Sequence, residues 1–391
     1  MNTAVADAPH LNPPQPIREG LRLHWSDGIE QCFSLRWLRS VCVCDTCGDS
    51  ASGKRWSVAR GMPRDPRITE ATREGADLHI AWQDGHRSHY PGAWLRTWQD
   101  EATAVSHWEP QRWDGRFSGP ARFDWQAVPT DAATRWALLR ELRDRGIALL
   151  DNVPATRDAT LSLTAPFGDA RPTNYGPVCD LESVPDAQVA GSTHRAQLPH
   201  TDEPFRYHPP GFIFFHCLQA GADAGGTSLM MDGFAVAERL RREHPAAFAL
   251  LQSTPLLFHR HHAAEVDFRA RGAVFPSDGA GRVLGMRFND RCLAPLDLPS
   301  AQLPAAFDAI DRLVALLADP ELQCRLLLEP GQALVFDNHR ILHGRTEFDP
   351  SKAHRHLRSC HIDREVMLSQ MRLLARQFAP QEAAWELRQG V

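Results

Sequence analysis

The sequence predicts a mainly β protein with flanking helices, made of a small N-terminal β domain and a larger β domain that holds a metal ion. Three observations predict this fold class. Short apolar runs bounded by turn residues recur in the second half of the chain, a hairpin pattern occurs twice near the N-terminus, and metal-binding residue types follow predicted strands. The chain has 391 residues. Chains of this length usually form more than one domain, each with its own hydrophobic core.

The predicted domain boundaries follow changes in composition. Residues 1–16 are polar and proline-rich, so we expect them to be disordered. We expect a β domain over residues 17–105, a linker over residues 106–125, where glycine and proline gather, and the larger domain over residues 126–391. No secretory apolar segment precedes the first cysteines, which suits a reducing compartment and a cytoplasmic location.

The N-terminal domain contains an internal repeat, in which each copy reads as strand, Asp-Gly turn, strand and then Trp-Leu-Arg. The offset between the copies is 57 residues, since Trp25 recurs as Trp82. The other matching pairs are Leu21 and Leu78, Asp27 and Asp84, Gly28 and Gly85, Trp37 and Trp94, Leu38 and Leu95, and Arg39 and Arg96. Two such hairpin units would pack together as a small β domain.

A zinc site is predicted in this domain. Three of the nine cysteines stand within six residues, as Cys42, Cys44 and Cys47. Three thiolates and one imidazole complete a closed tetrahedral site, which would be structural because no position is left for water or substrate. The fourth ligand is His86, just after the second Asp-Gly turn, or else His89 three residues further on. Free buried thiols are the alternative interpretation.

The first elements of the larger domain follow in chain order. Residues 131–144 form an amphipathic pattern that predicts a helix, with Gly146 as its stop. A strand is expected over 147–150. The aromatic run 212–218 follows a Pro-Pro-Gly turn and predicts a buried strand, and 225–231 reads as a turn leading into another strand.

The later elements lead to the C-terminus. Residues 304–318 predict a helix, and the runs 325–328 and 333–336 flank a Glu-Pro-Gly-Gln turn, which is a hairpin signal. A last helix begins near Asp363, with Val366, Leu373 and Leu374 on its faces. Such a stripe is most often part of a core, and it could also form a dimer contact.

A candidate iron site is formed by His200, Asp202 and His343. Two imidazoles and one carboxylate on one face of a metal leave the opposite positions open, as non-heme Fe(II) requires for a co-substrate and O2. Both parts of the motif stand at predicted strand ends. A double-sheet jelly roll, or double-stranded β-helix, brings such distant strands together at one mouth.

An arginine could anchor a dicarboxylate near this site, because a guanidinium binds a carboxylate through two hydrogen bonds. Arg355 stands 12 residues after His343. Arg358 is the competing anchor, and a surface ion pair is the plainer interpretation of either residue.

At this point the residues resemble the Fe(II)/2-oxoglutarate dioxygenases of the γ-butyrobetaine dioxygenase and trimethyllysine dioxygenase family. The matching strings span about residues 140 to 375. They are Leu198-Pro199-His200-Thr201-Asp202, Pro209-Pro210-Gly211 through His216-Cys217, Gly225-Gly226-Thr227-Ser228 with Asp232-Gly233-Phe234, Phe336-Asp337-Asn338 through His343-Gly344-Arg345, and Arg355-His356-Leu357.

The resemblance implies roles for these residues. His200, Asp202 and His343 would hold Fe(II), and Arg355 would pair with the distal carboxylate of 2-oxoglutarate with Ser228 as a helper. The family consumes 2-oxoglutarate and O2, releases succinate and CO2, and most often hydroxylates its substrate. It also carries an N-terminal domain with the same cysteine spacing and a later histidine, which agrees with structural Zn(II) at Cys42, Cys44, Cys47 and His86. Its C-terminal helices form homodimers.

The substrate differs from that of the γ-butyrobetaine enzymes, where an aromatic cage receives a trimethylammonium group. This chain keeps one ring, Tyr175, and has Cys179, Ser192 and His361 at the other three positions. Carnitine synthesis is therefore not expected.

Polar residues near the predicted mouth suit a different kind of molecule. Asn289 and Arg291, together with Ser192 and His361, suit a small polar or zwitterionic metabolite, and Arg291 could meet its carboxylate. The alternatives are a γ-butyrobetaine or trimethyllysine hydroxylase with a rebuilt cation pocket, and a non-catalytic binding protein on the same fold.

Charge and hydropathy exclude other partners. The formal net charge is −5, whereas nucleic-acid binding favours a clustered basic face. The apolar stretches are short and interrupted by charges, so no membrane span is expected. We expect a small-molecule substrate and a homodimer.

Overall fold

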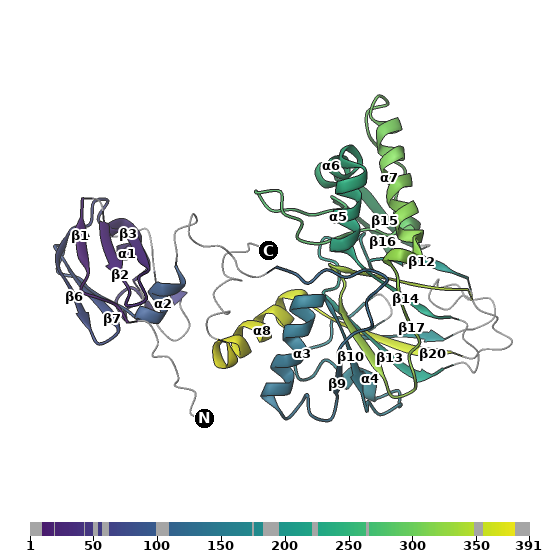
Figure 1. Cartoon of the computed structure of the whole chain (residues 1–391), viewed down its shortest axis with the longest axis horizontal. Coiled ribbons are helices and arrows are strands. Elements are labelled where there is room, and N and C mark those ends of the chain that lie inside the picture. Colours follow the sequence, from purple (N-terminus) through teal and green to yellow (C-terminus); the bar gives the residue numbers. More distant parts are fainter. Residues whose placement is uncertain are drawn as a thin grey trace. The chain divides into compact units, whose positions relative to one another are not determined.

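The computed structural model describes residues 10–18, 20–42, 44–49, 54–56, 62–98, 109–173, 176–182, 195–220, 226–262, 266–347 and 355–379. The chain divides into two compact units, Met1–His107 and Trp108–Val391 (Figure 1). Within the described residues, no helix combines the length and apolar character that crossing a bilayer requires.

The first unit consists of small antiparallel sheets and two short helices. One sheet has the strand order β1-β2-β3, another has the order β6-β7-β8, and β4 pairs with β5. Their bounds are β1 Gln15–Ile17, β2 Gly20–His24, β3 Glu30–Ser34, β4 Gly48–Asp49, β5 Lys54–Arg55, β6 Ile68–Glu74, β7 Asp77–Trp82 and β8 Arg87–Tyr90. Helix α1 spans Leu35–Ser40 and α2 spans Gly92–Thr97.

The internal repeat is visible in the contacts between its two copies. Arg39, which ends the first copy, pairs with Asp84 in the turn of the second copy, at 3.2 Å between Nη2 and Oδ2. Arg96, the equivalent residue of the second copy, pairs with Asp27 in the turn of the first. This reciprocal pairing joins the copies around a shared apolar core that includes Trp25.

Two larger sheets form the centre of the second unit, within the described residues. The six-stranded sheet has the order β11-β20-β13-β18-β10-β9, and the four-stranded sheet has the order β12-β19-β14-β17. The first comprises β9 Arg122–Asp124, β10 Ile147–Asp151, β11 Val178–Glu182, β13 Phe212–Gln219, β18 Ala333–Asp337 and β20 His356–Ile362. The second comprises β12 Gln197–His200, β14 Ser228–Asp232, β17 Cys324–Leu326 and β19 Ile341–Arg345.

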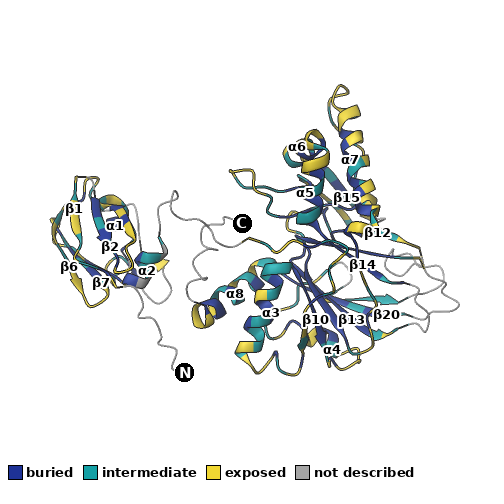
Figure 2. Ribbon diagram, viewed as in Figure 1, coloured by how far each residue is buried: buried dark blue, intermediate teal, exposed yellow. Residues whose placement is uncertain are grey.

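The core of the second unit lies between these sheets and beneath the helices. One buried cluster combines Ile213 and Phe336 of the larger sheet with Met230 and Ile341 of the smaller sheet. Two packed sheets with helices outside them confirm the predicted jelly roll. Figure 2 shows the central strands β10 and β13 as mostly buried, whereas the helices keep one exposed face.

Helices cover the outer sides of the sheets. α3 (Ala132–Arg145) contacts α8 (Arg364–Phe378), and both pack against the larger sheet. α5 (Gly233–Glu243), α6 (Pro245–Ser253) and α7 (Leu303–Ala318) form a second group in contact with one another. Short elements complete the unit, namely α4 Ala159–Ser162, the hairpin β15 Leu256–His262 with β16 Val266–Gly272, and the 3₁₀ turns η2 Asp290–Cys292 and η3 Pro320–Leu322.

The predicted helix after residue 131 is confirmed together with its ends. The Asp131 carboxylate accepts hydrogen bonds from the backbone N–H groups of Ala133 and Thr134, at 3.1 and 3.0 Å. Gly146 ends the helix with a φ of 78°, a left-handed conformation that glycine adopts without steric cost.

The hairpin predicted around residues 329–332 is wrong. The turn exists, and Gly331 has a φ of 85°, but the strands on its two sides belong to different sheets. β17 pairs with β14, whereas β18 pairs with β13 and β10. The turn therefore carries the chain from one sheet to the other, which apolar periodicity alone cannot indicate.

Residues 109–125 differ from the expected linker, because they are packed into the second unit. Trp113 is buried, and its indole N–H donates to the Arg145 carbonyl oxygen at 2.9 Å. Its backbone N–H donates to the Asp232 carboxylate at 3.2 Å. β9 then adds to the larger sheet as a parallel neighbour of β10.

Candidate metal centre and active site

The structure brings His200, Asp202 and His343 together at one end of the smaller sheet. β12 and β19 are antiparallel neighbours in which His200 and His343 stand directly opposite each other. The Nε2 atom of each histidine lies 3.6 Å from Oδ1 of Asp202. Ligand bonds of ~2.1 Å leave neighbouring donor atoms ~3 to 3.5 Å apart, so these three donors fit one metal ion.

The protonation states at this cluster also suit a metal. Nδ1 of His200 lies 2.8 Å from the Leu198 carbonyl oxygen, which fixes its proton there and leaves the Nε2 lone pair toward Asp202. Burial lowers the pKa of His343 to about 3, so its ring is neutral at physiological pH. Burial alone would raise the pKa of Asp202, but the two histidines outweigh it and lower that pKa. The Asp202 carboxylate, the neutral His343 ring and the His200 ring together form a donor set that favours a divalent cation.

Asn338 holds the backbone of the segment that carries Asp202. It is almost fully buried, in the turn between β18 and β19. Its side-chain oxygen accepts from the Asp202 backbone N–H at 2.7 Å, and its side-chain NH₂ donates to the carbonyl oxygens of Asp202 and Pro210 at 3.1 and 3.0 Å. These three bonds fix the direction in which the Asp202 carboxylate leaves the chain. The sequence indicated Asn338 only as part of a string.

We expect the Asn338→Ala variant to bind divalent metal about 10- to 100-fold more weakly than the wild type, as is typical when a group that orients a ligand is removed. The measurement is the dissociation constant for Mn(II), a stand-in for Fe(II), from electron paramagnetic resonance titration. Circular dichroism serves as the control for folding. An unchanged constant in a folded variant would contradict the positioning role of Asn338.

Arg291 reaches the metal cluster from η2. Its Nη2 lies 2.9 Å from Nε2 of His200, and its Nε donates to Asn289 Oδ1 at 3.3 Å. Asn289 is buried and also caps the backbone of η2, so it fixes the base of this arm. The guanidinium therefore lies at the edge of the site, where it can meet an anionic group of a bound molecule.

Arg355 lies in the interior beside Ser228. Its Nη2 donates to Ser228 Oγ at 3.1 Å, and burial lowers its pKa to about 10, so the guanidinium stays charged. Arg345 stands opposite Ser228 in the pairing of β19 with β14. Burial, with the positive charge of Arg355 nearby, lowers the pKa of Arg345 to about 10. The partly buried guanidinium of Arg355 next to the Ser228 hydroxyl suits a carboxylate.

Arg358, the competing anchor, points elsewhere. Its Nε lies 3.1 Å from the Asp180 carboxylate, and it also donates to the Arg157 carbonyl oxygen. His356 binds the same carboxylate at 2.7 Å. Of the two arginines that the sequence left open, Arg355 is the one next to Ser228.

The predicted substrate residues are only partly described. His361 is buried in β20, and its Nδ1 has no hydrogen-bond partner among the described residues. Burial lowers the pKa of His361, and the Asp202 carboxylate opposes this shift. Burial, together with the Asp202 carboxylate, raises the pKa of Cys179. Tyr175 and Ser192 lie outside the described residues.

A second cluster of metal-binding groups lies in the first unit. Nε2 of His86 is 3.4 Å from Cys42 Sγ, 3.5 Å from Cys44 Sγ and 3.6 Å from Cys47 Sγ. Zinc bonded to sulfur at ~2.3 Å and nitrogen at ~2.1 Å in a tetrahedron places these atoms ~3.5 Å apart. His89 is instead paired with Asp77 at 2.7 Å, so the donor set that fits zinc contains His86.

Comparison with known proteins agrees with both units. Residues 109–361 match the family "Taurine catabolism dioxygenase TauD, TfdA", and residues 16–96 match "Gamma-butyrobetaine hydroxylase-like, N-terminal". A γ-butyrobetaine dioxygenase of Pseudomonas sp. (strain AK-1) is 33% identical, over 91% of this chain and 94% of that protein.

More distant relatives cover the same length. The γ-butyrobetaine dioxygenase of Homo sapiens is 27% identical, over 90% of this chain and 94% of that protein. A trimethyllysine dioxygenase of Meyerozyma guilliermondii is 27% identical, over 91% and 94%. The resemblance predicted from sequence motifs is thus confirmed: the chain belongs to the TauD, TfdA family, and it is an oxidoreductase of the Fe(II)- and 2-oxoglutarate-dependent dioxygenase class.

Proposed function

We propose that His200, Asp202 and His343 hold the catalytic iron. The second unit would oxidise a small polar or zwitterionic metabolite, and hydroxylation is the proposed reaction. The observation that carries this proposal is the meeting of two imidazoles and one carboxylate at neighbouring strands. Bound iron would supply the oxidation chemistry that couples O2 and 2-oxoglutarate to the substrate, with release of succinate and CO2. The chain itself positions the reactants and excludes water.

We propose that 2-oxoglutarate extends from the iron site to Arg355. The guanidinium would pair with its distal carboxylate through two hydrogen bonds, and the Ser228 hydroxyl would add a third contact. What supports this is the burial of Arg355 and its bond to Ser228.

We expect Arg355→Ala to raise the KM for 2-oxoglutarate about 100-fold, because a buried charge-assisted pair is lost. Arg358→Ala is the matched control, since its side chain faces Asp180, and it should change that KM less than about threefold. Steady-state succinate formation measures both. A larger effect of Arg358→Ala than of Arg355→Ala would show that Arg358, and not Arg355, is the anchor.

We propose Arg291 as the contact for a carboxylate or another acidic group of the substrate. Its guanidinium lies beside His200 and must move from Nε2 when that atom binds a metal, which frees it for an anion. Asn289, Ser192 and His361 would add polar contacts, and Tyr175 would supply one ring face. With Cys179 and His361 at cage positions, little cation–π attraction is available for a trimethylammonium group.

We expect Arg291→Ala to raise the KM for an anionic or zwitterionic substrate about tenfold or more and to leave the KM for 2-oxoglutarate nearly unchanged. Asp290→Ala, next to it in the exposed 3₁₀ turn, is the control. Equal substrate KM values for the wild type and Arg291→Ala would show that Arg291 does not contact a carboxylate of the substrate.

The substrate itself requires a panel of betaines, amino acids and small phosphonates with product mass analysis. A product with one added oxygen identifies hydroxylation, and a product that has lost two hydrogens identifies desaturation or ring closure. Turnover of γ-butyrobetaine or trimethyllysine above all other compounds would favour the alternative of a carnitine-type hydroxylase with a rebuilt cation pocket.

We propose that the first unit is a zinc-binding domain and that the protein forms a homodimer. The three thiols around His86 support the zinc site. Leu373 and Phe378 of α8 support a dimer contact, because these apolar side chains are 52% and 39% exposed. The cytoplasmic location stays a prediction from composition.

A further inference from the structure

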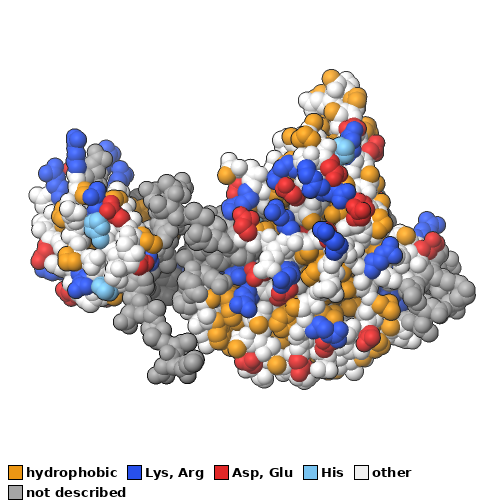
Figure 3. All heavy atoms as spheres, viewed as in Figure 1, with side chains coloured by type: hydrophobic (Ala, Val, Ile, Leu, Met, Phe, Trp, Pro, Cys, Tyr) orange, Lys and Arg blue, Asp and Glu red, His pale blue; other side chains and the backbone are white. Residues whose placement is uncertain are grey.

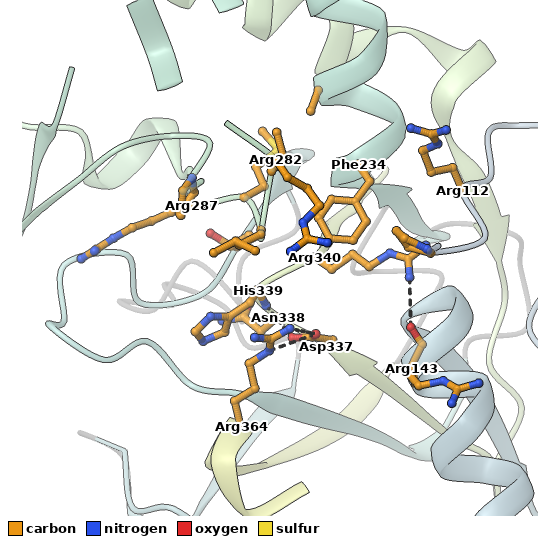
Figure 4. A pocket seen from close by; sticks show the side chains of 18 of the residues that line it. Arg112, Arg143, Phe234, Arg282, Arg287, Asp337, Asn338, His339, Arg340 and Arg364 are labelled. Carbon is orange, nitrogen blue, oxygen red and sulfur yellow. Dashed lines mark hydrogen bonds and ion pairs between the residues drawn. The ribbon is translucent and has the colours of Figure 1, made fainter. Parts of the chain in front are cut away.

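The second unit contains a cavity of about 680 Å³ that the proposed reaction does not use. It lies among α5, α6, the segment 276–287, the turn 337–340 and α8 (Figure 4). The residues that line it, within the described part of the chain, include none of the proposed iron ligands and neither Arg355 nor Arg291. Its volume falls within the range of small-molecule sites.

The cavity combines an apolar wall with a basic lining. Phe212, Phe248 and Met286 contribute buried apolar surface. Eight arginines line the cavity against three acidic residues. Figure 3 shows Lys and Arg side chains, with Asp and Glu side chains among them, on one face of the second unit.

Four of the arginines are paired with carboxylates within the fold, among them Arg143 with Asp144 at 2.8 Å and Arg282 with Asp278 at 2.9 Å. Arg340 is buried with Asp232, at 2.8 Å. Arg364 pairs with Asp337 at 3.1 Å, as Figure 4 shows. Their charges are therefore largely offset and attract a ligand weakly.

Other arginines keep an excess of positive charge. Arg112 and Arg241 share one carboxylate, Glu238, at 3.8 and 3.1 Å, and both guanidinium-bearing side chains are about half exposed, at 52% and 42%. Exposed ion pairs of this kind stabilise little, so these arginines can turn toward a ligand at low cost. Arg287 donates to the carbonyl oxygens of Pro204 and Arg206, which offset its charge by dipoles alone.

We infer that this cavity binds a small organic anion with an apolar body. The head group would meet Arg112 and Arg241 at the rim, and the body would lie against Phe248 and Phe234. Arg241 already lies over the Phe248 ring, 4.3 Å from its centre, so one side chain joins the basic rim to the apolar wall.

The cavity shares a wall with the proposed iron site. Thr201 and Asn338 line it, and they flank or bind the Asp202 segment. A ligand seated against Asn338 would favour the backbone arrangement that aims Asp202 at the metal, so the two binding events would strengthen each other by the same factor. This coupling rests on the proposed iron site, whereas anion binding does not.

The test uses the full chain and two fluorescent probes of similar shape. 8-Anilino-1-naphthalenesulfonate carries a sulfonate, and N-phenyl-1-naphthylamine is uncharged. We expect saturable binding of one sulfonate probe per chain and binding of the uncharged probe at least about tenfold weaker, since the charge-assisted contact is lost. Equal affinities, or no saturable site, would overturn the inference.

Two neighbouring arginines of α5 give a matched pair of variants. Arg241→Ala should weaken binding of the sulfonate probe about tenfold. Arg242→Ala should not change it, because Arg242 pairs with Glu243 and does not line the cavity. Both side chains are exposed, so both variants are expected to fold. The same affinity in both variants would place the bound probe elsewhere.

Two further readings complete the experiment. Mn(II) should tighten binding of the sulfonate probe in the wild type but not in His200→Ala, and no change in the wild type would overturn the coupling alone. Light scattering on the same samples measures the oligomeric state of the protein. A dimer that excludes the probe would make the cavity part of an interface between two copies and overturn the ligand site.

Discussion

The Asp202→Ala variant is expected to lose Fe(II)-dependent succinate formation by about three orders of magnitude or more. Asp202 supplies the one carboxylate of the cluster, and its Oδ1 lies 3.6 Å from both histidine Nε2 atoms. Without it, the two imidazoles remain, and neither carries a negative charge to offset that of a divalent cation. Mn(II) binding measured by electron paramagnetic resonance should fall with activity.

The control for this variant is Asp169→Ala, which removes an exposed carboxylate of the same unit. It should keep both metal binding and turnover. Wild-type turnover by folded Asp202→Ala protein would show that the carboxylate of the iron site comes from another residue.

Removal of zinc is expected to unfold the first unit. A structural zinc site of this kind contributes about 10 kcal/mol or more of apparent binding free energy, which exceeds what so small a core supplies alone. The site also joins the two copies of the repeat, because the cysteines follow α1 and His86 precedes β8. Cys42→Ser should therefore release zinc and lose the near-ultraviolet circular dichroism of the buried Trp25 and Trp82.

Cys32→Ser is the matched control, since Cys32 is an exposed cysteine of the same unit outside the cluster. It should retain one zinc per chain and the tryptophan signal. A metal-free protein with an unchanged tryptophan signal would contradict a stabilising role for the cluster.

The metal-binding residue types could be predicted from sequence because each kind of site requires particular ligands at particular places. His200 and His343 are 143 residues apart, yet the jelly roll pairs their strands, and the structure sets them opposite each other. Cysteine spacing similarly indicated a cluster, and the repeat added His86 to it.

Other features depend on neighbours that are distant in sequence. The different surroundings of Arg355 and Arg358 depend on β11, which brings Asp180 to Arg358. The predicted hairpin would have paired β17 with β18. β17 pairs with β14 instead, because β14 is its neighbour in space. The positioning role of Asn338 exists only because the turn after β18 meets the Asp202 backbone. Local patterns carry none of this information.

The central claim is tested most directly by succinate release from the full chain reconstituted with Fe(II) without air, then supplied with 2-oxoglutarate and O2. We predict iron-dependent succinate formation that one member of the substrate panel stimulates and that His200→Ala abolishes. Absence of iron-dependent succinate under all these conditions, even without substrate, would contradict the account and favour a binding protein on the same fold.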